Sequence, residues 1–532
     1  MKSISSVGSD LRTRMNALCT CSSSDLTVCM YDQSKLFAKQ GYISLKEYLA
    51  DINHMKTSGP WRLPLRIGDR LHLALLGFVA RFSWFADTIY IAHRSNVSPA
   101  YAILLSYAKR QGIFDSMGER DLHCQGYFSY FLKKTVDIPS RKDNLMSSQG
   151  VAEDRMTALS KALGEMIERM VTGVHDKNTD FLVGSPDALA ADQISLIYPP
   201  QHHRFLEIQK ERFKRLRYDS SKPIQWVSGR NLVTDQKTLI PRRITQWFVA
   251  NGEREEVFAH ATTNGSAGYF TRTGAVLRGL LEVVQRDGLL VHWLTMIPPE
   301  MISVETLPDN LRERVRKLES YGLSIHILNV TSLSIPSVIV AVTNNHSKYA
   351  YQVTLSGAAD VNFHDAIENA LREIMIGSEM FYYPEEGTKT GLEKTEPEPF
   401  VSRFGKAERQ LYWRGTKRMK NFEWFISGNA VSYRDICQKY DALPMKQDSR
   451  KLSWCIDQLK GFGSDYHPVV YFPKNLIQKE LGFYVAQVFI PKAFPLYLVE
   501  YMGTFDSDRL KEFARSKGRS EWVLNPFPHM FS

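Results

Sequence analysis

The chain has 532 residues, of which 43% are hydrophobic, 23% charged and 11% aromatic, with a formal charge of +10. This length exceeds a single compact core and favours two to four domains, or one large fold with additions. The basic clusters, at residues 210–218 and 414–422, lack the repeated aromatic-basic pattern of a nucleic-acid platform. They suit solvated helix faces, so we expect no nucleic-acid partner, although a mild positive balance suits anionic ligands such as nucleotide phosphates.

The N-terminal part shows no targeting or metal signal. Residues 1–31 form a loose segment without the apolar stretch of a secretory signal, and residues 32–138 form a mixed α/β region. The most apolar run, residues 71–93, is interrupted by Arg81 and Asp87, which favours a buried helix over a membrane span. The six cysteines include no C-x-x-C pair, which argues against a zinc site or a disulfide scaffold. We therefore expect a cytoplasmic protein without a membrane partner.

Periodicity predicts the remaining elements in chain order. They are a helix over 153–174, a hairpin over 221–245 with its turn at Ser228 and Gly229, two buried strands within 323–345, a helix over 364–380, an exposed insertion at 383–400, and strands in 466–473 and 483–491. Helices and strands alternate throughout, which predicts a mixed α/β (α+β) class. The adjacent His202 and His203 have no third ligand nearby in the sequence, and we interpret them as a loop feature rather than a metal site.

Two distant segments, 162–170 and 279–287, repeat one pattern: Glu, two apolar residues, Glu or Gln, then Arg. Residues at i and i+3 share a helix face, so each segment aims two oxygen ligands at one point. The two pairs are Glu165 with Glu168, and Glu282 with Gln285. Oxygen ligands beside cations are what magnesium bound to a nucleotide requires. The second segment also follows the small-residue turn 264–268, a type of turn that lets backbone approach a ligand.

The same spacing is open to a plainer interpretation. Glu165 with Arg169, and Glu282 with Arg286, are also i,i+4 pairs, which support an ordinary surface helix by ~0.2–0.5 kcal/mol. Against this, Glu165 and Glu168 are like charges on one face, which is unfavourable unless a cation lies between them. The chain contains no Walker P-loop, no G-x-G-x-x-G, no H-E-x-x-H and no G-x-S-x-G motif.

At these two helices the sequence resembles the YcaO family, whose ATP site has no Walker motif. "ALSKALGEMIER", with Gly150 fifteen residues before Glu165, is similar to the family's first helix, and "TNGSAGYFTRTGAVLRGLLEVVQRDGLLVHW" is similar to the second. "SGAADVNFHDAIENALREI" and "VFIPKAFPLYLVEY" extend the likeness. The resemblance implies a YcaO-type catalytic domain over residues 139–532, with mixed sheets and helices around the ATP site and an N-terminal extension.

The resemblance also implies roles for single residues. The implied magnesium ligands are Glu165, Glu168, Glu282 and Gln285, and the implied nucleotide-binding residues are Arg169, Ser266, Gly268 and Arg286. Two positions depart from the family's pattern, since Gln285 replaces a second Glu and Gly274 replaces a common acidic residue. Gln285 keeps an oxygen but loses a charge, which leaves the magnesium stoichiometry and the ATP turnover open.

The C-terminal segment, residues 524–532, carries a second resemblance. Azoline-forming members typically end in Pro-x-Pro-x-Pro, and here Pro526 and Pro528 match while Met530 stands at the third position. This spacing favours an extended polyproline II segment that reaches into a neighbouring cleft. We therefore predict that Pro526 and Pro528 act with Arg286 at the catalytic centre. A frayed end that happens to contain two prolines is the alternative.

The implied activity is cyclodehydration of a ribosomally made precursor peptide, as in bacteriocin biosynthesis. By the family's chemistry, a Cys, Ser or Thr side chain attacks the preceding backbone carbonyl, ATP phosphorylates the oxyanion, and phosphate leaves as the thiazoline or oxazoline forms. Magnesium and Arg286 would neutralise charge on the transferring group. The chain is too short to hold an E1-like peptide-binding domain as well, so we expect a separate leader-binding partner, docked by residues 32–138. Thioamide or amidine formation, a non-catalytic scaffold and a homodimer remain open.

Overall fold

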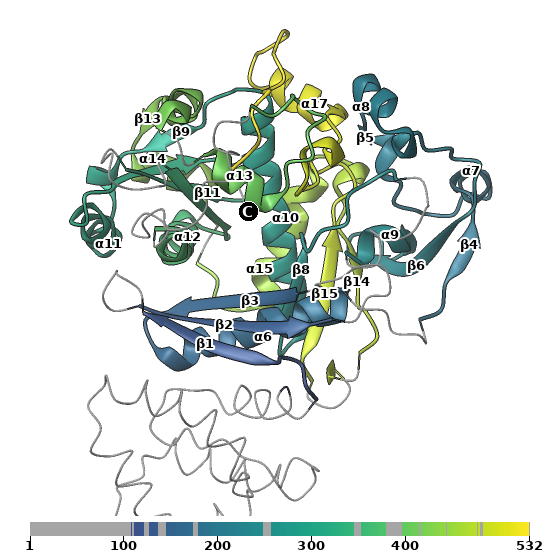
Figure 1. Ribbon diagram of the computed structural model, residues 1–532, viewed down its shortest axis with the longest axis horizontal. Coiled ribbons are helices and arrows are strands. Elements are labelled where there is room, and N and C mark those ends of the chain that lie inside the picture. Colours follow the sequence, from purple (N-terminus) through teal and green to yellow (C-terminus); the bar gives the residue numbers. More distant parts are fainter. Residues whose placement is uncertain are drawn as a thin grey trace, which may run out of the picture. The chain divides into compact units, whose positions relative to one another are not determined.

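The protein is described from a computed structural model (Figure 1). It describes residues 108, 111–121, 127–136, 145–173, 179–247, 257–344, 353–378, 396–413, 416–442, 444–475, 477–478 and 482–530. The predicted loose segment 1–31 and apolar run 71–93 lie outside these residues, as does most of the predicted insertion 383–400. The chain divides into two compact units, one of residues 1–121 and 126–167, and one of residues 122–125 and 168–532.

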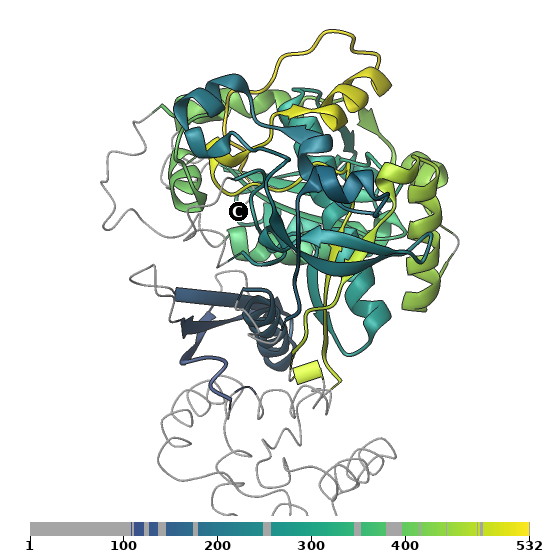
Figure 2. The ribbon, with the colours of Figure 1, turned by 90° about the vertical axis from the view of Figure 1, so that its right-hand side faces the viewer.

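The first unit contains a three-stranded antiparallel sheet in the order β1-β2-β3. The strands are β1 (Ser116–Asp121), β2 (Phe128–Thr135) and β3 (Leu145–Ala152), followed by helix α6 (Arg155–Gly173). Figure 2 shows this sheet from the side, with α6 beside it. A Cβ atom on Gly150 of β3 would lie 2.1 Å from the carbonyl oxygen of Ala158, so only glycine lets the strand approach α6 this closely. The predicted helix 153–174 is confirmed.

The second unit contains two larger sheets. The six-stranded sheet has the order β4-β6-β14-β15-β8, with β7 paired to β6: β4 (Leu182–Gly184), β6 (Ile224–Asn231), β14 (Val469–Tyr471), β15 (Tyr484–Phe489), β8 (Ser266–Tyr269) and β7 (Lys237–Pro241). The five-stranded sheet has the order β12 (Val353–Ala359), β11 (Ser337–Thr343), β10 (Ser324–Asn329), β9 (Glu300–Ile302) and β13 (Ala430–Val431). A small pair joins β5 (His203–Arg204) to β16 (Asp506–Ser507).

The predicted hairpin is present as β6 and β7, but its predicted turn at Ser228 and Gly229 is wrong. Both residues lie within β6, where a Cβ on Gly229 would come within 2.5 Å of Ile240 Cδ1. Gly229 is therefore a packing residue, as glycine in a strand often is. The turn follows Asn231, whose Oδ1 accepts hydrogen bonds from the backbone of two later residues, a common way for Asn to begin a turn.

The helices of the second unit surround and separate the two sheets. They are α7 (Pro186–Ala191), α8 (Glu207–Arg212), α9 (Arg242–Thr245), α10 (Arg272–Leu294), α11 (Asp309–Glu319), α12 (Phe363–Ser378), α13 (Lys406–Tyr412), α14 (Tyr433–Tyr440), α15 (Asp448–Lys460) and α17 (Asp508–Ser516). The mixed α/β class is confirmed, as are the strands predicted within 323–345, 466–473 and 483–491 and the helix predicted over 364–380.

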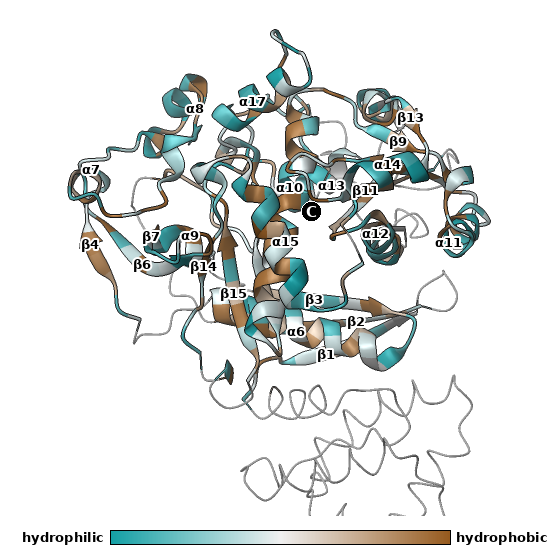
Figure 3. Ribbon diagram, turned by 180° about the vertical axis from the view of Figure 1, so that it is seen from behind, coloured by the Kyte–Doolittle hydropathy of each residue, from teal (hydrophilic) through white to brown (hydrophobic). Residues whose placement is uncertain are grey.

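Helix α10 is the central element of the second unit. It contacts β15 and β8 of one sheet and β11 and β12 of the other (Figure 1), and most of its side chains are buried. Thr271 begins the helix, since its Oγ1 accepts a hydrogen bond from Gly274 N. Figure 3 shows the core strand β15 as largely hydrophobic, whereas the peripheral helix α11 is largely hydrophilic. In the described ranges, no helix combines the length and the apolar character needed to span a membrane.

Candidate functional site

The small-residue turn predicted before α10 is fastened to that helix at two points. Gly265 has a φ of +79°, and its backbone N–H donates to Glu282 Oε2 over 3.3 Å. A Cβ on Gly279 would lie 2.4 Å from the Gly265 carbonyl oxygen, so the glycine at 279 allows this close approach. The turn therefore contacts Glu282, one of the carboxylates predicted to bind magnesium.

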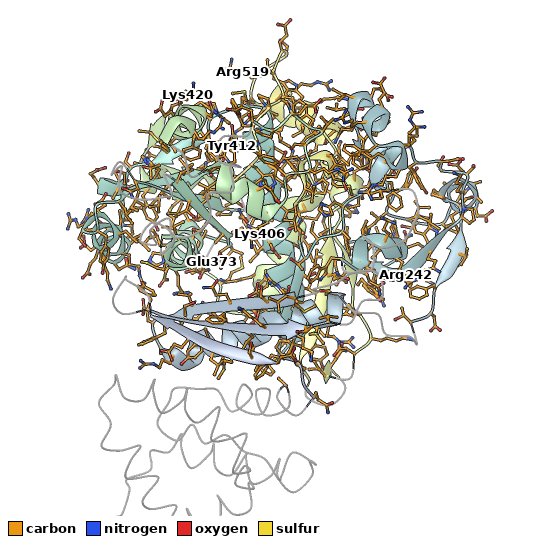
Figure 4. All side chains as sticks on the ribbon, viewed as in Figure 1. Arg242, Glu373, Lys406, Tyr412, Lys420 and Arg519 are labelled. Carbon is orange, nitrogen blue, oxygen red and sulfur yellow. The ribbon has the colours of Figure 1, made fainter. Side chains whose placement is uncertain are left out.

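Arg286 interacts with carboxylates from two helices. Its Nη2 is 3.4 Å from Glu282 Oε1, one turn back on α10. Burial lowers the pKa of Arg286, and the charges of Glu282 and of Glu373 on α12, labelled in Figure 4, oppose that shift. The side chain of Glu282 is 30% exposed and that of Arg286 15% exposed, so Glu282 retains access to solvent. Glu282 and Arg286 thus form the i,i+4 ion pair of an ordinary surface helix. The pair also contacts the backbone of the Gly265 turn, so it belongs to a larger arrangement.

Gln285 is turned away from solvent, with only 2% of its surface exposed. Its Oε1 accepts a hydrogen bond from Arg286 Nη1, while its Nε2 has no hydrogen-bond partner among the described residues. A Cβ on Gly357 of β12 would lie 2.3 Å from that Nε2, so the glycine makes room for the amide. The oxygen predicted to bind magnesium is thus engaged by Arg286, and the metal role of Gln285 stays a prediction.

Gly274, the second departure from the family's pattern, lies under an aromatic ring. A Cβ at this position would lie 2.2 Å from Tyr269 Cδ1. The guanidinium of Arg278 stacks 3.6 Å from the centre of the Tyr269 ring and donates to the Gly274 carbonyl oxygen. An acidic side chain at position 274 would collide with Tyr269 in this arrangement. No pattern in the sequence had pointed to Tyr269 or Arg278.

The residues predicted to line the nucleotide form a strand rather than an open loop. Ser266 and Gly268 lie in β8 and pair with Gln487 and Val485 of β15. Ser266 is buried, and its Oγ lies 3.4 Å from Gln487 Nε2. The backbone between the Gly265 turn and α10 is therefore held by the sheet, and the nucleotide-lining role of Ser266 and Gly268 stays a prediction.

The first unit holds Glu165, whose Oε2 accepts a hydrogen bond of 2.7 Å from the backbone N–H of Gln149. Glu168 and Arg169, also on α6, are counted with the second unit, and all three side chains are partly exposed. Because Glu165 and Glu282 belong to different compact units, the meeting of the two helices around one metal ion stays a prediction.

The C-terminal segment is docked on the end of α10. Asn525 binds the carbonyl oxygens of Trp293 and Leu294, through its side chain at 3.0 Å and its backbone N–H at 2.9 Å. The indole of Trp293 donates to Phe527 O, and that of Trp413 donates to Pro528 O, both over 3.1 Å. Trp293 lies seven residues beyond Arg286, or about 10 Å along the helix at its usual rise. The predicted catalytic role of Pro526 and Pro528 stays a prediction.

The segment is further held by His529, whose Nε2 lies 2.9 Å from the Tyr497 carbonyl oxygen. Arg409 of α13 contacts the same imidazole and donates to Leu498 O over 2.8 Å. Glu500 lies 3.8 Å from Arg409, and burial raises its pKa to about 7 despite the attraction of that cation. Sequence reasoning missed this group of residues, because nothing in the local pattern links α13 to the last residues of the chain.

A separate group of possible metal ligands is neutralised by its neighbours. His364, Asp365 and Glu368 place ligand atoms within 4.8 Å of one another on α12. Lys451 lies 3.4 Å from Asp365, and Arg372 lies 3.2 Å from Glu368. The adjacent His202 and His203 belong to no group of three candidate metal ligands among the described residues.

Comparison with protein families identifies a match over most of the chain. The profile of the family described as YcaO cyclodehydratase, ATP- and Mg2+-binding, matches residues 149–493. No match was found among curated protein sequences. The match spans both repeated Glu-x-x-Glu/Gln-Arg segments, together with α12 and β15.

Solved structures show the same fold at low sequence identity. A structure described as a heterocyclase in complex with substrate and cofactor is 16% identical, with a TM-score of 0.66, and the match covers 83% of this chain and 58% of that one. The heterocyclase TruD is 17% identical, with a TM-score of 0.51, covering 70% of this chain and 50% of that one. YcaO from Methanopyrus kandleri, bound with AMPPCP and Mg2+, is 15% identical, with a TM-score of 0.52, covering 80% and 93%. This chain thus spans only 58% and 50% of the first two structures.

Proposed function

The chain belongs to the YcaO family, and we propose that it is an ATP- and Mg2+-dependent cyclodehydratase that forms thiazoline or oxazoline rings in a precursor peptide. The observation that carries this proposal is the arrangement around Glu282, where the Gly265 turn, the carboxylate and Arg286 meet on α10. A backbone N–H, an accessible carboxylate and a guanidinium are the groups that a magnesium–phosphate complex requires.

The donor set of the described residues fits this cofactor. Glu282 has one oxygen directed at Gly265 N and one at Arg286, and its partial exposure leaves room for a metal ion to compete for them. Glu165 and Glu168 would complete the set of hard oxygen ligands, with Ser266 and Gly268 beside the nucleotide and Arg169 near its phosphates. When bound, ATP supplies the phosphoryl group that turns a backbone amide oxygen into a leaving group. Arg286 would hold the phosphates in place and offset their charge.

We further propose that the chain works with a separate E1-like protein that binds the leader of the precursor peptide. The heterocyclase structures that share this fold are longer than this chain, which spans 58% and 50% of them. Residues 32–138 are the proposed docking region, and the C-terminal segment with Pro526 and Pro528 is proposed to act near the reacting centre.

Calorimetric titration of ATP with magnesium tests the proposal. Glu282→Ala should abolish magnesium-dependent binding, whereas Glu368→Ala should not. Glu368 is a matched control, since it forms an i,i+4 pair with Arg372 over 3.2 Å on α12. Incubation with the partner protein and a precursor peptide should then give the loss of one water per ring. Absence of both ATP hydrolysis and ring formation under these conditions would contradict the enzyme proposal.

Product mass and ATP binding separate this proposal from its alternatives. Thioamide formation would exchange oxygen for sulfur in the product, and amidine formation would give a different mass again. A non-catalytic scaffold is favoured by one observation, the occupation of the space at Gly274 by Tyr269. For such a scaffold, the wild-type titration should show no magnesium-dependent ATP binding that Glu282→Ala removes.

A further inference from the structure

The basic cluster at residues 210–218 lies on the surface of the second unit, and the proposed chemistry gives it no role. Its cations outnumber its carboxylates: they are Lys210, Arg212, Lys214, Arg215 and Arg217, against Glu211 alone. The cluster begins near the end of α8 and continues through a short 3-10 helix, Lys214–Leu216. Such a local excess of positive charge attracts anionic partners.

Three of these cations have no carboxylate partner. Lys214, Arg215 and Arg217 are exposed, and none of them forms an ion pair with another residue in the described ranges. Lys210, by contrast, pairs with Glu207 over 2.7 Å. Neighbouring like charges repel one another, so a ligand that carries negative charge would relieve this repulsion. We call Lys214, Arg215 and Arg217 the basic surface.

The backbone that carries the basic surface is fixed from two directions. The buried side chain of Gln209 on α8 donates through Nε2 to the Tyr501 carbonyl oxygen over 3.0 Å. The Arg215 carbonyl oxygen accepts a hydrogen bond of 2.7 Å from Val257 N, and the side chain of Leu216 is buried. A ligand would therefore meet cations on an ordered backbone, which lowers the entropy cost of binding.

Apolar groups lie beside these cations. Ile208 is 49% exposed and shares a face of α8 with Arg212, four residues later. The rings of Phe213 and Tyr501 have centres 4.3 Å apart with an angle of 32° between their planes, and Arg403 lies 5.7 Å from the centre of the Phe213 ring. Because the two rings pack against each other, they do not form the open stacking platform that single-stranded nucleic acids use. Exposed cations beside an exposed aliphatic side chain suit an acidic peptide.

The basic surface is also linked to the docked C-terminal segment. Tyr501 directly follows Glu500, which lies 3.8 Å from Arg409, and Arg409 contacts His529 of that segment. We propose that the basic surface holds an acidic segment of the precursor peptide, with an apolar side chain of that segment against Ile208. This inference rests on the proposed function, because it takes a peptide as the substrate.

Fluorescence anisotropy with the full chain tests the inference. The probe is a short labelled peptide rich in glutamate with two leucines, and the control peptide has glutamine in place of every glutamate. The glutamate peptide should bind saturably, and more weakly at higher salt, whereas the glutamine peptide should not bind. Lys214→Glu with Arg217→Glu should weaken binding of the glutamate peptide by about 10-fold, and Ile208→Ser by about 3-fold.

Arg316→Glu with Lys317→Glu is the matched control, since it makes the same change in net charge at two exposed positions of α11. Figure 1 shows α11 on the opposite side of the second unit from α8. This control should leave binding of the glutamate peptide within about 2-fold of wild type, because the charges are too distant to act through salt. Equal weakening by both double variants would overturn the inference, since net charge alone would explain it.

Magnesium–ATP binding by Lys214→Glu with Arg217→Glu should equal that of wild type. With a precursor peptide that carries an acidic segment, this variant should raise the KM of ring formation by about 10-fold and leave kcat unchanged. An unchanged KM would overturn the inference. A chain that binds magnesium–ATP but not the glutamate peptide would overturn it too, while the proposed function would stand. Tighter binding of a uridine-rich RNA through the same cations would overturn it in favour of a nucleic-acid partner.

Discussion

Asp287 and Arg509 form an ion pair that is 0% and 3% exposed and joins α10 to α17. Arg509 donates to both carboxylate oxygens, through Nε over 2.9 Å and Nη2 over 2.5 Å. The same carboxylate accepts from Ser332 Oγ and from the backbone N–H of Phe494, each over 2.7 Å. Asp287 therefore has a structural role in joining these elements. It directly follows Arg286, the residue proposed to bind the ATP phosphates.

Asp287→Asn should destabilise the protein strongly, because it leaves Arg509 buried beside a neutral amide. Breaking one partner of a buried pair typically costs about 3–5 kcal/mol. Urea unfolding followed by circular dichroism measures this free energy. The double variant Asp287→Leu with Arg509→Met should recover part of the loss, since it removes both charges.

The control for this prediction is Asp235→Asn, which removes a charge from an exposed ion pair with Arg230. It should leave the unfolding midpoint unchanged, because surface pairs contribute little. A small effect of Asp287→Asn, equal to that of the control, would show that Arg509 finds solvent when its partner is lost.

Gly279→Ala should separate the Gly265 turn from α10. The added methyl would lie 2.4 Å from the Gly265 carbonyl oxygen, a contact with backbone that requires the turn to shift. We expect weaker magnesium–ATP binding by calorimetry, with the helix retained by circular dichroism. Gly461→Ala is the control, because its methyl would meet only the Gln458 carbonyl oxygen at 3.3 Å. If Gly279→Ala leaves ATP binding unchanged, the Gly265 turn is not part of the nucleotide site.

Gln285→Glu tests whether the neutral amide limits metal binding. The new carboxylate would be buried near Glu282, so burial and this like charge should raise its pKa in the folded state, against the attraction of Arg286, which contacts the present amide oxygen. A raised pKa means that stability is lost as pH rises, so we expect the variant to be less stable than wild type by about 1–3 kcal/mol at pH 8 and by less at pH 5. Magnesium with ATP should restore it at pH 8. Thermal unfolding with and without both ligands measures this, and no recovery would place position 285 outside the metal site.

Much of the fold follows from local sequence pattern, whereas the detail of the site does not. The 3.6-residue apolar period of α6, α10 and α12 and the β-branched runs of β10 and β11 are local signals, and each element appears as predicted. The ring of Tyr269 over Gly274 could not be predicted, because it depends on the strand geometry of β8. The Asp287–Arg509 pair joins residues 222 positions apart, a separation that no periodicity encodes. The resemblance supplied the site residues, and the contacts show which of them also carry structure.

Glu500 should give the protein a pH-dependent stability. Burial raises its folded pKa to about 7 from an ordinary value near 4.5, against the attraction of Arg409. A raised pKa contributes stability that is present below about pH 4.5 and lost as pH rises through 7, a change of about 3 kcal/mol. The buried histidines 203, 260 and 292 have lowered pKa values and act in the opposite sense below pH 6.5. Only the difference between wild type and Glu500→Gln isolates this carboxyl group.

Unfolding free energies at pH 5 and pH 8 give that difference. The fall in stability from pH 5 to pH 8 should be smaller in Glu500→Gln than in wild type, by about 3 kcal/mol at most. Glu319→Gln, at an exposed position of α11, should leave the fall unchanged. An identical pH profile for Glu500→Gln and wild type would show that Glu500 titrates in its ordinary range.

Trp413→Phe should loosen the C-terminal segment without unfolding the protein. The variant keeps an aromatic ring in the core but loses the indole donor to Pro528 O, at a cost of about 1 kcal/mol in stability. Carboxypeptidase should then release the last residues faster than from wild type, since one of the hydrogen bonds that hold the segment is lost. Trp424→Phe is the control, because its indole donates to the nearby Asn421 O and not to the tail. If ring formation falls with Trp413→Phe but not with Trp424→Phe, the docked segment serves catalysis. If Trp413→Phe speeds release of the C-terminal residues while ring formation is unchanged, Pro526 and Pro528 have no catalytic role. The segment then serves only to close the core.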